Sequence, residues 1–369
     1  MARIEFDLTG TLEALASMME GMENDLSVQC IMVLTCDENQ FITHHFNAHI
    51  TAVKKPIFGG IFPQIIYENH AYARGSIVVG FPFECTLDVL ESLQAETELT
   101  YNFVPQTASL TRVVFVDGLT SGIGMFMESL FIHLGVERPY IGGGAGSLSL
   151  KPSACIITPK GLLQDSAIVA TLNTSAGIGV AHGWKIISPS FKVSSSSKNT
   201  LHTLDWEEAF TVYKNVVEGH SGQKFNDTNF FDIAKAYPFG IGKYDSEVIV
   251  RDPLFLGEKG SMICVGEVPE GSFVHILHGH NESLLKAASL ARTRAQEACQ
   301  CTKATYSMTL FIDCISRVLF LEDAFNDEIA AVKENDVVLV GALTLGEIAN
   351  NGKDSLEFYN KTSVVGLFQ

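Results

Sequence analysis

The chain has 369 residues, of which 46% are hydrophobic and 18% charged, and its formal net charge is −17. This length suits two domains or one large elaborated domain, with enough apolar residues to bury a sizeable core. The acidic charge repels phosphate backbones and anionic lipid heads, which argues against nucleic acid and membrane surfaces as general partners.

The eight cysteines lie mostly inside apolar runs such as VQCIMVLTC and SMICVG, where cysteine behaves as a small buried hydrophobe. Their spacing does not have the pattern of a disulfide scaffold. The first residues, MARIEFDLTG, lack the basic-then-apolar layout of a signal peptide, and no uninterrupted apolar run is long enough to span a bilayer. We therefore expect a soluble cytoplasmic protein without membrane insertion.

Short β-rich runs alternate with helical patterns in the first half of the chain. Apolar residues on one face predict a helix over 9–23 with Thr9 as its N-cap, followed by a buried strand over 28–36. The next runs predict strand, helix, strand and helix over 76–80, 86–96, 111–118 and 121–134. After the glycine-rich IGGGAG come three β-rich runs, 153–158, 166–172 and 177–184, which we expect to pair antiparallel with one another.

Four successive serines, Ser194 to Ser197, indicate an exposed turn or linker within 189–204. We place a domain boundary near 190–205. A helix over 206–217 with Asp205 as its N-cap should follow. The remaining patterns predict strands near 247–251, 261–265, 273–277, 306–313, 336–341 and 362–368, and helices near 282–301 and 322–331.

These patterns predict an α/β chain of the mixed α+β kind, with two mixed-sheet domains and packed helices over residues 1–195 and 196–369. Because the spacing of the elements is irregular, we do not expect a repeat protein.

Several common active-site signatures are missing. The run IGGGAGSLSL lacks the Lys-Ser/Thr of a P-loop and the third glycine of a dinucleotide fingerprint, and the chain has no G-x-S-x-G elbow. Histidines are the remaining candidates. On a strand, His278 and His280 would share a face as a metal-ligand pair, or they are solvated surface residues. His182, at the end of an apolar run, is either a ligand or a satisfied core residue.

A series of segments in a fixed order carries a family resemblance: VVFVDGLTSG, YIGGGAGS, GIGVAHGWKIISPSFKV, LDWEEAFTVYKNVV, VRDPLFLGEKGSMICVGEVPEGSFVHIL, LFIDCISR and LVGALTLGEIANNGKDSLEFYNKTSVVGLF. Over nearly its whole length the chain resembles the FIST family, with its N- and C-terminal FIST sensory domains. The resemblance implies an intracellular small-molecule sensor rather than an enzyme, and amino acids are the ligands proposed across the family. One stand-alone branch, the NosP group, looks like a set of haem-binding nitric oxide sensors that act on a partner histidine kinase.

The chain departs from the family pattern near residue 59. There the family usually has a Gly-Cys turn leading to Ala-Gly-Glu, whereas this chain has Gly60, Ile61, Phe62 and Pro63. We interpret the segment as an apolar binding loop that proline stiffens.

The haem-binding branch implies haem b as cofactor, with His182 as axial ligand to the iron and Trp184, Phe62 and Pro63 beside it. Alternatively, His182 hydrogen-bonds a backbone carbonyl at a strand end while Trp184 fills the seam between domains.

A second candidate site comprises Cys314, Arg317, Gly346 and Glu347. In the family such residues lie at strand ends, where Arg317 and Glu347 could clamp the two ends of a zwitterion such as an amino acid. The alternative is an internal Arg–Glu ion pair that locks the domain.

Three functions follow, in order of preference. The first is a sensor that binds nitric oxide through haem and modulates a histidine kinase, and the second is an amino-acid or metabolite sensor without haem. The third is a metal-dependent hydrolase that uses His278 and His280. The oligomeric state and the surface that contacts the partner stay open.

Overall fold

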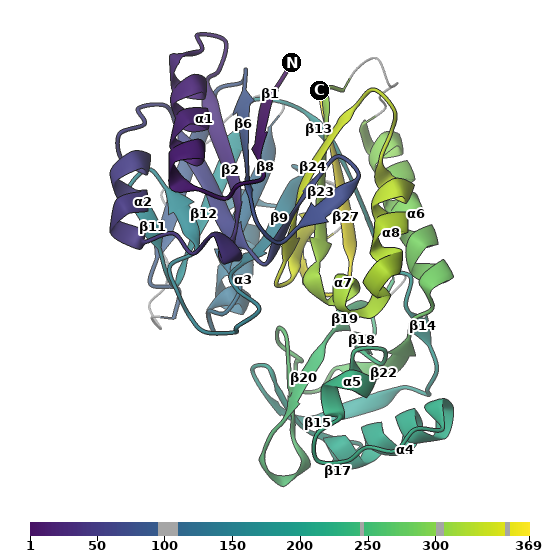
Figure 1. Ribbon diagram of the computed structural model, residues 1–369. Coiled ribbons are helices and arrows are strands. Elements are labelled where there is room, and N and C mark those ends of the chain that lie inside the picture. Colours follow the sequence, from purple (N-terminus) through teal and green to yellow (C-terminus); the bar gives the residue numbers. More distant parts are fainter. Residues whose placement is uncertain (95–109, 244–246, 300–305, 351–354) are drawn as a thin grey trace.

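The computed structural model of the chain describes residues 1–94, 110–243, 247–299, 306–350 and 355–369. The described residues form two parts, which we call the body and the lobe (Figure 1). The body comprises residues 1–184 and 279–369, and the lobe comprises residues 185–278. The lobe is thus an insertion into the body, and Figure 1 shows it below the body, in teal and green.

The described part of the body contains three six-stranded sheets. Sheet 1 has the order β1 (Arg3–Asp7), β6 (Ser76–Phe81), β2 (Cys30–Cys36), β3 (Ile57–Phe62), β10 (Ile156–Thr158), β11 (Gly161–Leu163). Sheet 2 has the order β7 (Cys85–Glu91), β12 (Ser166–Leu172), β8 (Thr111–Asp117), β9 (Tyr140–Ala145), β25 (Glu347–Asn350), β26 (Glu357–Tyr359). Sheet 3 has the order β13 (Ala176–Ala181), β27 (Ser363–Phe368), β23 (Met308–Cys314), β24 (Val338–Thr344), β4 (Gln64–Tyr67), β5 (His70–Tyr72).

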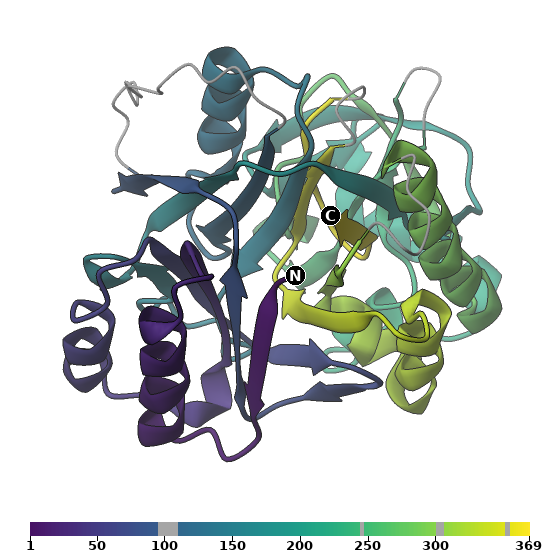
Figure 2. The same cartoon turned by 90° about the horizontal axis from the view of Figure 1, so that it is seen from above.

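The three sheets repeat one topology. In each, the two central strands are parallel (β2–β3, β8–β9, β23–β24), and the remaining neighbours are antiparallel. Each sheet takes four strands from one of three units of the body, which comprise β1 to β6, β7 to β12, and β13 with β23 to β27. The other two strands of each unit form a hairpin that joins another sheet: β4–β5 pairs with β24, β10–β11 with β3, and β25–β26 with β9. Seen from above, the three units occupy three sectors, with their helices on the outside (Figure 2). The body is therefore an internal threefold repeat whose units are tied together by exchanged hairpins.

A recurrent glycine marks the same position in each unit. Gly59, Gly142 and Gly341 lie opposite Val33, Val114 and Phe311 in the parallel pairs. A Cβ at these glycines would lie 1.9, 1.7 and 1.9 Å from the carbonyl oxygen of the opposite residue. Only glycine allows this close backbone approach.

Helices cover the outer faces of the body sheets. The sequence of helix α1 (Leu12–Asn24) explains where it begins and which face it buries. Thr11 caps it by accepting a hydrogen bond from the Ala14 amide at 3.3 Å, and four buried apolar residues follow at helical spacing. The body helices are α1 (Leu12–Asn24), α2 (Thr43–Ile50), α3 (Ile123–Leu134), α6 (Asn281–Cys299), α7 (Ile315–Leu321) and α8 (Phe325–Val332).

The lobe holds a nine-stranded sheet with its own buried core. Two helices accompany it, α4 (Ala209–Ser221) and α5 (Phe230–Ala234). Its strands are β14 (Lys185–Ile186), β15 (Phe191–Ser197), β16 (Thr200–Leu204), β17 (Glu207–Glu208), β18 (Phe239–Ile241), β19 (Ile249–Arg251), β20 (Pro253–Leu256), β21 (Met262–Cys264) and β22 (Phe273–His278).

The chain passes between body and lobe at two adjacent places, each with a glycine. The first is His182-Gly183-Trp184 and the second is His278-Gly279-His280. Gly183 has φ +79°, and a Cβ there would lie 2.5 Å from the Ser283 carbonyl oxygen; a Cβ on Gly279 would lie 2.4 Å from the Trp184 ring. Both glycines are required where the two crossings pack together.

Much of the predicted element order is present, and the structure corrects several details. Contrary to expectation, the body contains an internal repeat. The expectation was wrong because the lobe insertion makes the spacing of the repeated units unequal. Residues 85–91 form strand β7 instead of a helix, since pairing with β12 outweighs local propensity. The runs 153–158, 166–172 and 177–184 pair with other strands and not with one another.

Three further expectations need revision. The serine-rich segment is strand β15 instead of an exposed turn or linker. Asp205 lies in a turn, and α4 begins at Ala209. Six cysteines carry free thiols as expected, five of them buried, but Cys299 is disulfide-bonded.

Among the helices that the structure describes, none combines the length and apolar character needed to cross a bilayer.

Candidate functional site

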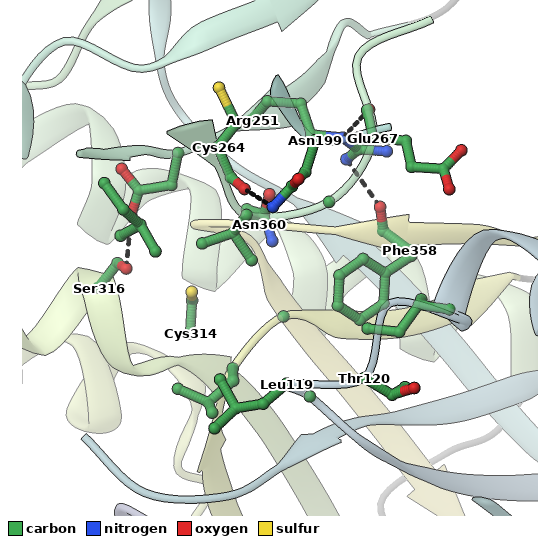
Figure 3. Close-up of a pocket in the computed structure, with 18 of the residues that line it drawn as sticks. Leu119, Thr120, Asn199, Arg251, Cys264, Glu267, Cys314, Ser316, Phe358 and Asn360 are labelled. Atoms are coloured by element: carbon green, nitrogen blue, oxygen red, sulfur yellow. Dashed lines mark hydrogen bonds between the residues drawn. The ribbon is translucent and has the colours of Figure 1, made fainter. Parts of the chain in front are cut away.

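A cavity of about 540 Å³ lies where the lobe meets the body. The body contributes the segment after β8, the start of α7 and the residues just before β25, and the lobe contributes residues around β19, β20 and β21. In Figure 3, Arg251, Asn199 and Cys264 of the lobe lie across the cavity from Leu119, Thr120 and Cys314 of the body. The site therefore depends on both parts of the molecule.

Arg251 is the cation among the described residues that line this cavity, and it is 8% exposed. Its Nε donates to the Glu267 carbonyl at 2.8 Å, and its Nη1 donates to the carbonyls of Val250 and Phe358 at 3.0 and 2.8 Å. Among the described residues no carboxylate forms an ion pair with it, and its Nη2 has no hydrogen-bond partner. Burial lowers the pKa of the guanidinium, which nevertheless stays charged. The nearby carboxylates of Glu357 and Glu267, which also line the cavity, act in the opposite direction on this pKa, so an anionic group of a ligand would share the guanidinium with them.

Two acceptors line the same cavity. Asp252 is fully buried; its Oδ2 accepts from the Ser316 hydroxyl at 2.6 Å and lies 3.1 Å from Lys361 Nζ. Its Oδ1 has no hydrogen-bond partner among the described residues, and neither has Oδ1 of the fully buried Asn360. Burying an acceptor without a partner is costly, so each of these enclosed atoms would gain from a donor, which a ligand can supply once the side chain turns toward the cavity.

The rest of the lining is largely apolar. It includes side chains from α3, from the strand ends of the body and from the lobe: Ile123, Met127, Leu254, Leu345 and Phe358. The described lining therefore joins one cation, two unpartnered acceptors and the carboxylates of Glu267 and Glu357 to an apolar space, an arrangement typical of small-molecule sites.

Two of the four residues predicted for the second site line this cavity, namely Cys314 and Gly346. Arg317 does not line it. All of its N–H groups are used: they donate to Glu328 and to the carbonyls of His182, Lys361 and Leu284. Arg317 therefore ties α7 to α8, to α6 and to the first chain crossing.

Glu347 is also fully buried and lies outside the lining. Its carboxylate accepts from the Thr344 hydroxyl at 2.9 Å and from the Thr362 amide at 3.2 Å. Burial raises its pKa to about 8, against the influence of these bonds and of Arg317. Glu347 thus belongs to a buried network one residue away from the cavity wall.

His182 is 8% exposed and does not line the cavity. Its Nδ1 accepts from the Trp184 amide at 3.0 Å, its carbonyl accepts from Arg317, and its Nε2 lies 3.7 Å from Glu247 Oε2. Burial lowers its pKa to about 4, so the ring is neutral near pH 7.

Trp184 is buried, contacts the Phe320 ring at a tilt of 60° and donates its Nε1–H to the Lys361 carbonyl at 3.0 Å. Together with His182, it fastens the first chain crossing.

Phe62 and Pro63 do not form a loop at a ligand. Phe62 belongs to β3, is fully buried and contacts Phe115 edge-on, with ring centroids 5.3 Å apart; Pro63, also buried, joins β3 to β4. The unusual apolar segment is thus part of the core of the body.

The predicted histidine pair does lie together. The rings of His278 and His280 are 4.5 Å apart between centroids, and His220 lies 4.9 Å from His278. Even so, the described residues include no group of three or more His, Cys, Asp or Glu side chains arranged to hold a metal ion.

Sequence reasoning missed Arg251, Asp252 and Asn360. A weak signal existed, because Arg251-Asp252 ends a strand just before Pro253 and stands within a motif of the family resemblance. What the sequence lacked was the lobe–body contact that brings residue 251 beside residues 358 and 360.

Two family models match the chain. The FIST N domain matches residues 32–207, and the FIST C domain matches residues 209–350. FIST domains are sensory domains of signal-transduction proteins that bind small ligands, and the chain belongs to this FIST family. No curated protein matches the chain closely enough to add to that assignment.

Proposed function

We propose that the chain senses an amino acid, or a closely related small zwitterion with an apolar side chain, bound in the cavity between body and lobe. The observation that carries the proposal is the pairing of the Arg251 guanidinium with the open acceptors of Asp252 and Asn360 in one cavity. The ligand carboxylate would bind Arg251, and its ammonium group would bind the two acceptor oxygens.

The surroundings support the same ligand. The carboxylate would accept from Nη2, the edge of the guanidinium that lacks a protein partner. The apolar side chain would occupy the space next to Ile123, Met127 and Leu254. A larger apolar side chain would bury more surface and bind more tightly, by about 25 cal/mol for each Å².

A thermal shift experiment on the full chain tests the proposal. We would titrate each common amino acid separately and expect apolar and aromatic ones to raise the melting temperature in a saturable way. A ligand at one hundred times its Kd stabilises a folded protein by about 2.7 kcal/mol. If none of them raises the melting temperature while haem gives a strong Soret band, the proposal is wrong.

A haem-binding nitric oxide sensor that modulates a histidine kinase is the second candidate, which the family resemblance implies. An axial histidine offers iron one unprotonated ring nitrogen and donates the N–H of the other. Nδ1 of His182 faces the Trp184 N–H, so the neutral ring carries its proton on Nε2, next to Glu247. The residues around His182 therefore do not fit haem as an axial site, and we derive no step through it.

A further inference from the structure

The hairpin between β16 and β17 has an unusual turn. Leu204 pairs with Glu207, which leaves Asp205 and Trp206 as a two-residue loop. Their φ values are +47° and +67°, which define a turn with both central residues in the left-handed region. Such turns strongly favour Asn-Gly or Asp-Gly, because a bulky side chain at positive φ is strained. Tryptophan occupies the position where glycine would be expected.

Burial does not compensate for this strain. Trp206 is 75% exposed, and Lys192 Nζ lies 5.5 Å from the centroid of its ring. Phe273, 53% exposed, lies directly opposite Lys192 across the β15–β22 pair, so both side chains are on the same face. Trp206, Lys192 and Phe273 thus form one exposed patch, which we call the Trp206 patch.

The backbone of the turn is held firmly by β15. The Asp205 amide donates to the Lys192 carbonyl, and the Lys192 amide donates to Asp205 Oδ1, both at 2.9 Å. The Trp206 amide donates to the Ser194 hydroxyl at 2.8 Å. A strained, rigid and exposed tryptophan is poorly explained by folding alone. It has the properties of a binding anchor, because little backbone freedom of the turn remains to be lost on association.

The position and charge of the patch indicate what binds there. Figure 1 places β17 at the end of the lobe farthest from the body, and so away from the cavity. Asp205, Glu207 and Glu208 are exposed around Trp206 and outnumber Lys192. A second copy of this chain, or an anionic membrane, would meet repulsion from a protein of net charge −17. A partner protein with basic groups on its surface would instead be attracted to these acidic residues.

We propose that the Trp206 patch docks a partner protein whose surface offers an apolar pocket with a basic rim. The indole enters the pocket, and the carboxylates of Asp205, Glu207 and Glu208 face the rim. The docking surface is separate from the ligand cavity, so it does not depend on which ligand the cavity binds.

The test begins with the full chain carrying a photo-crosslinking residue at position 207, produced in cells of the source organism. The captured protein is then purified, and its affinity is measured with wild type, Trp206→Gly and Phe131→Ala. The last is a matched control, because Phe131 is a 55% exposed aromatic residue on α3 of the body. Glycine suits the turn, so Trp206→Gly should fold with an unchanged or higher melting temperature.

We expect Trp206→Gly to weaken binding at least about tenfold, as loss of an aromatic anchor does, and Phe131→Ala to leave it unchanged. Binding should also weaken as salt is raised. Equal affinity for wild type and Trp206→Gly would overturn the proposal, as would crosslinking to no protein or only to a second copy of the chain. Trp206-dependent binding to phosphatidylcholine–phosphatidylglycerol vesicles would overturn it in favour of a membrane surface.

Discussion

Glu347 follows a cavity-lining glycine, yet its carboxyl group is enclosed. Burial raises its pKa from 4.5 to about 8, so the folded chain holds a proton there near neutral pH. The unfolded chain releases that proton above about pH 4.5. Because the folded state binds more protons between these values, the free energy of unfolding should fall as pH rises through this window.

Glu347→Gln should reduce the fall in the free energy of unfolding between pH 4.5 and about 8. The glutamine carbonyl can accept from the Thr362 amide, and its NH₂ can donate to the Thr344 hydroxyl, which itself donates to the Asp313 carbonyl at 3.2 Å. Urea unfolding across pH 5–8 measures the difference between variant and wild type.

His182 supplies an internal control for this measurement. Its folded pKa of about 4 lies below the ordinary 6.5, so its contribution to stability is lost as pH falls from 6.5 to 4. The loss of stability between pH 6.5 and pH 4 that His182 causes should be the same in wild type and in Glu347→Gln. Identical slopes above pH 6.5 would show that Glu347 does not hold the proton.

At the scale of the elements, the parallel strand pairs depend on their recurrent glycines. Gly142→Ala would drive a Cβ into the Val114 carbonyl, and we expect it to destabilise the chain by on the order of 2–4 kcal/mol. Gly219→Ala is the matched control: it lies in α4 with no atom within 4 Å of the added Cβ, and it should stabilise by about 0.5–1 kcal/mol. Thermal unfolding measures both, and a harmless Gly142→Ala would contradict the close approach.

The sequence predicted which residues form strands and helices better than it predicted which strands pair with one another. Buried strands such as 28–36 and 306–313 were legible because hydrophobic runs of that length are strand-like whatever their neighbours. The same patterns could not show that β4–β5 crosses to β24, or that β25–β26 crosses to β9, since exchange of a hairpin leaves the local pattern unchanged. The helix prediction over 86–96 was wrong for residues 86–91, because their apolar spacing suits a helix while pairing with β12 decides for a strand; residues 95 and 96 lie outside the described residues.

The site shows the same limit. Cys314 and Gly346 were named from the family motifs, and both line the cavity. Arg317 and Glu347 were named with them, but each is one step removed, inside the buried network. Arg251 could not be chosen from the sequence, because its role depends on a contact between the lobe and residues more than one hundred positions later.

At the scale of the whole molecule, the lobe is an insertion that turns a threefold body into a two-part protein with a cavity at the junction. The junction is closed by buried contacts: Lys361 with Asp252, Ser316 with Asp252, and Arg251 with the Phe358 carbonyl. A ligand that bridges Arg251 and Asp252 to the body would change the strength of this closure. If the proposed ligand binds in this way, binding in the cavity would be coupled to the position of the lobe, which carries the Trp206 patch.

Titration calorimetry of the best amino-acid ligand against wild type, Arg251→Gln, Arg251→Lys and Lys214→Gln tests the central claim most directly. Lys214, an exposed cation on α4, serves as the control. Arg251→Gln should weaken binding by about one hundredfold. Arg251→Lys should weaken it by less, because lysine keeps the positive charge but lacks the paired N–H donors of the guanidinium. Lys214→Gln should bind as wild type does. Wild-type affinity in a folded Arg251→Gln variant would contradict the claim that this cavity recognises the ligand.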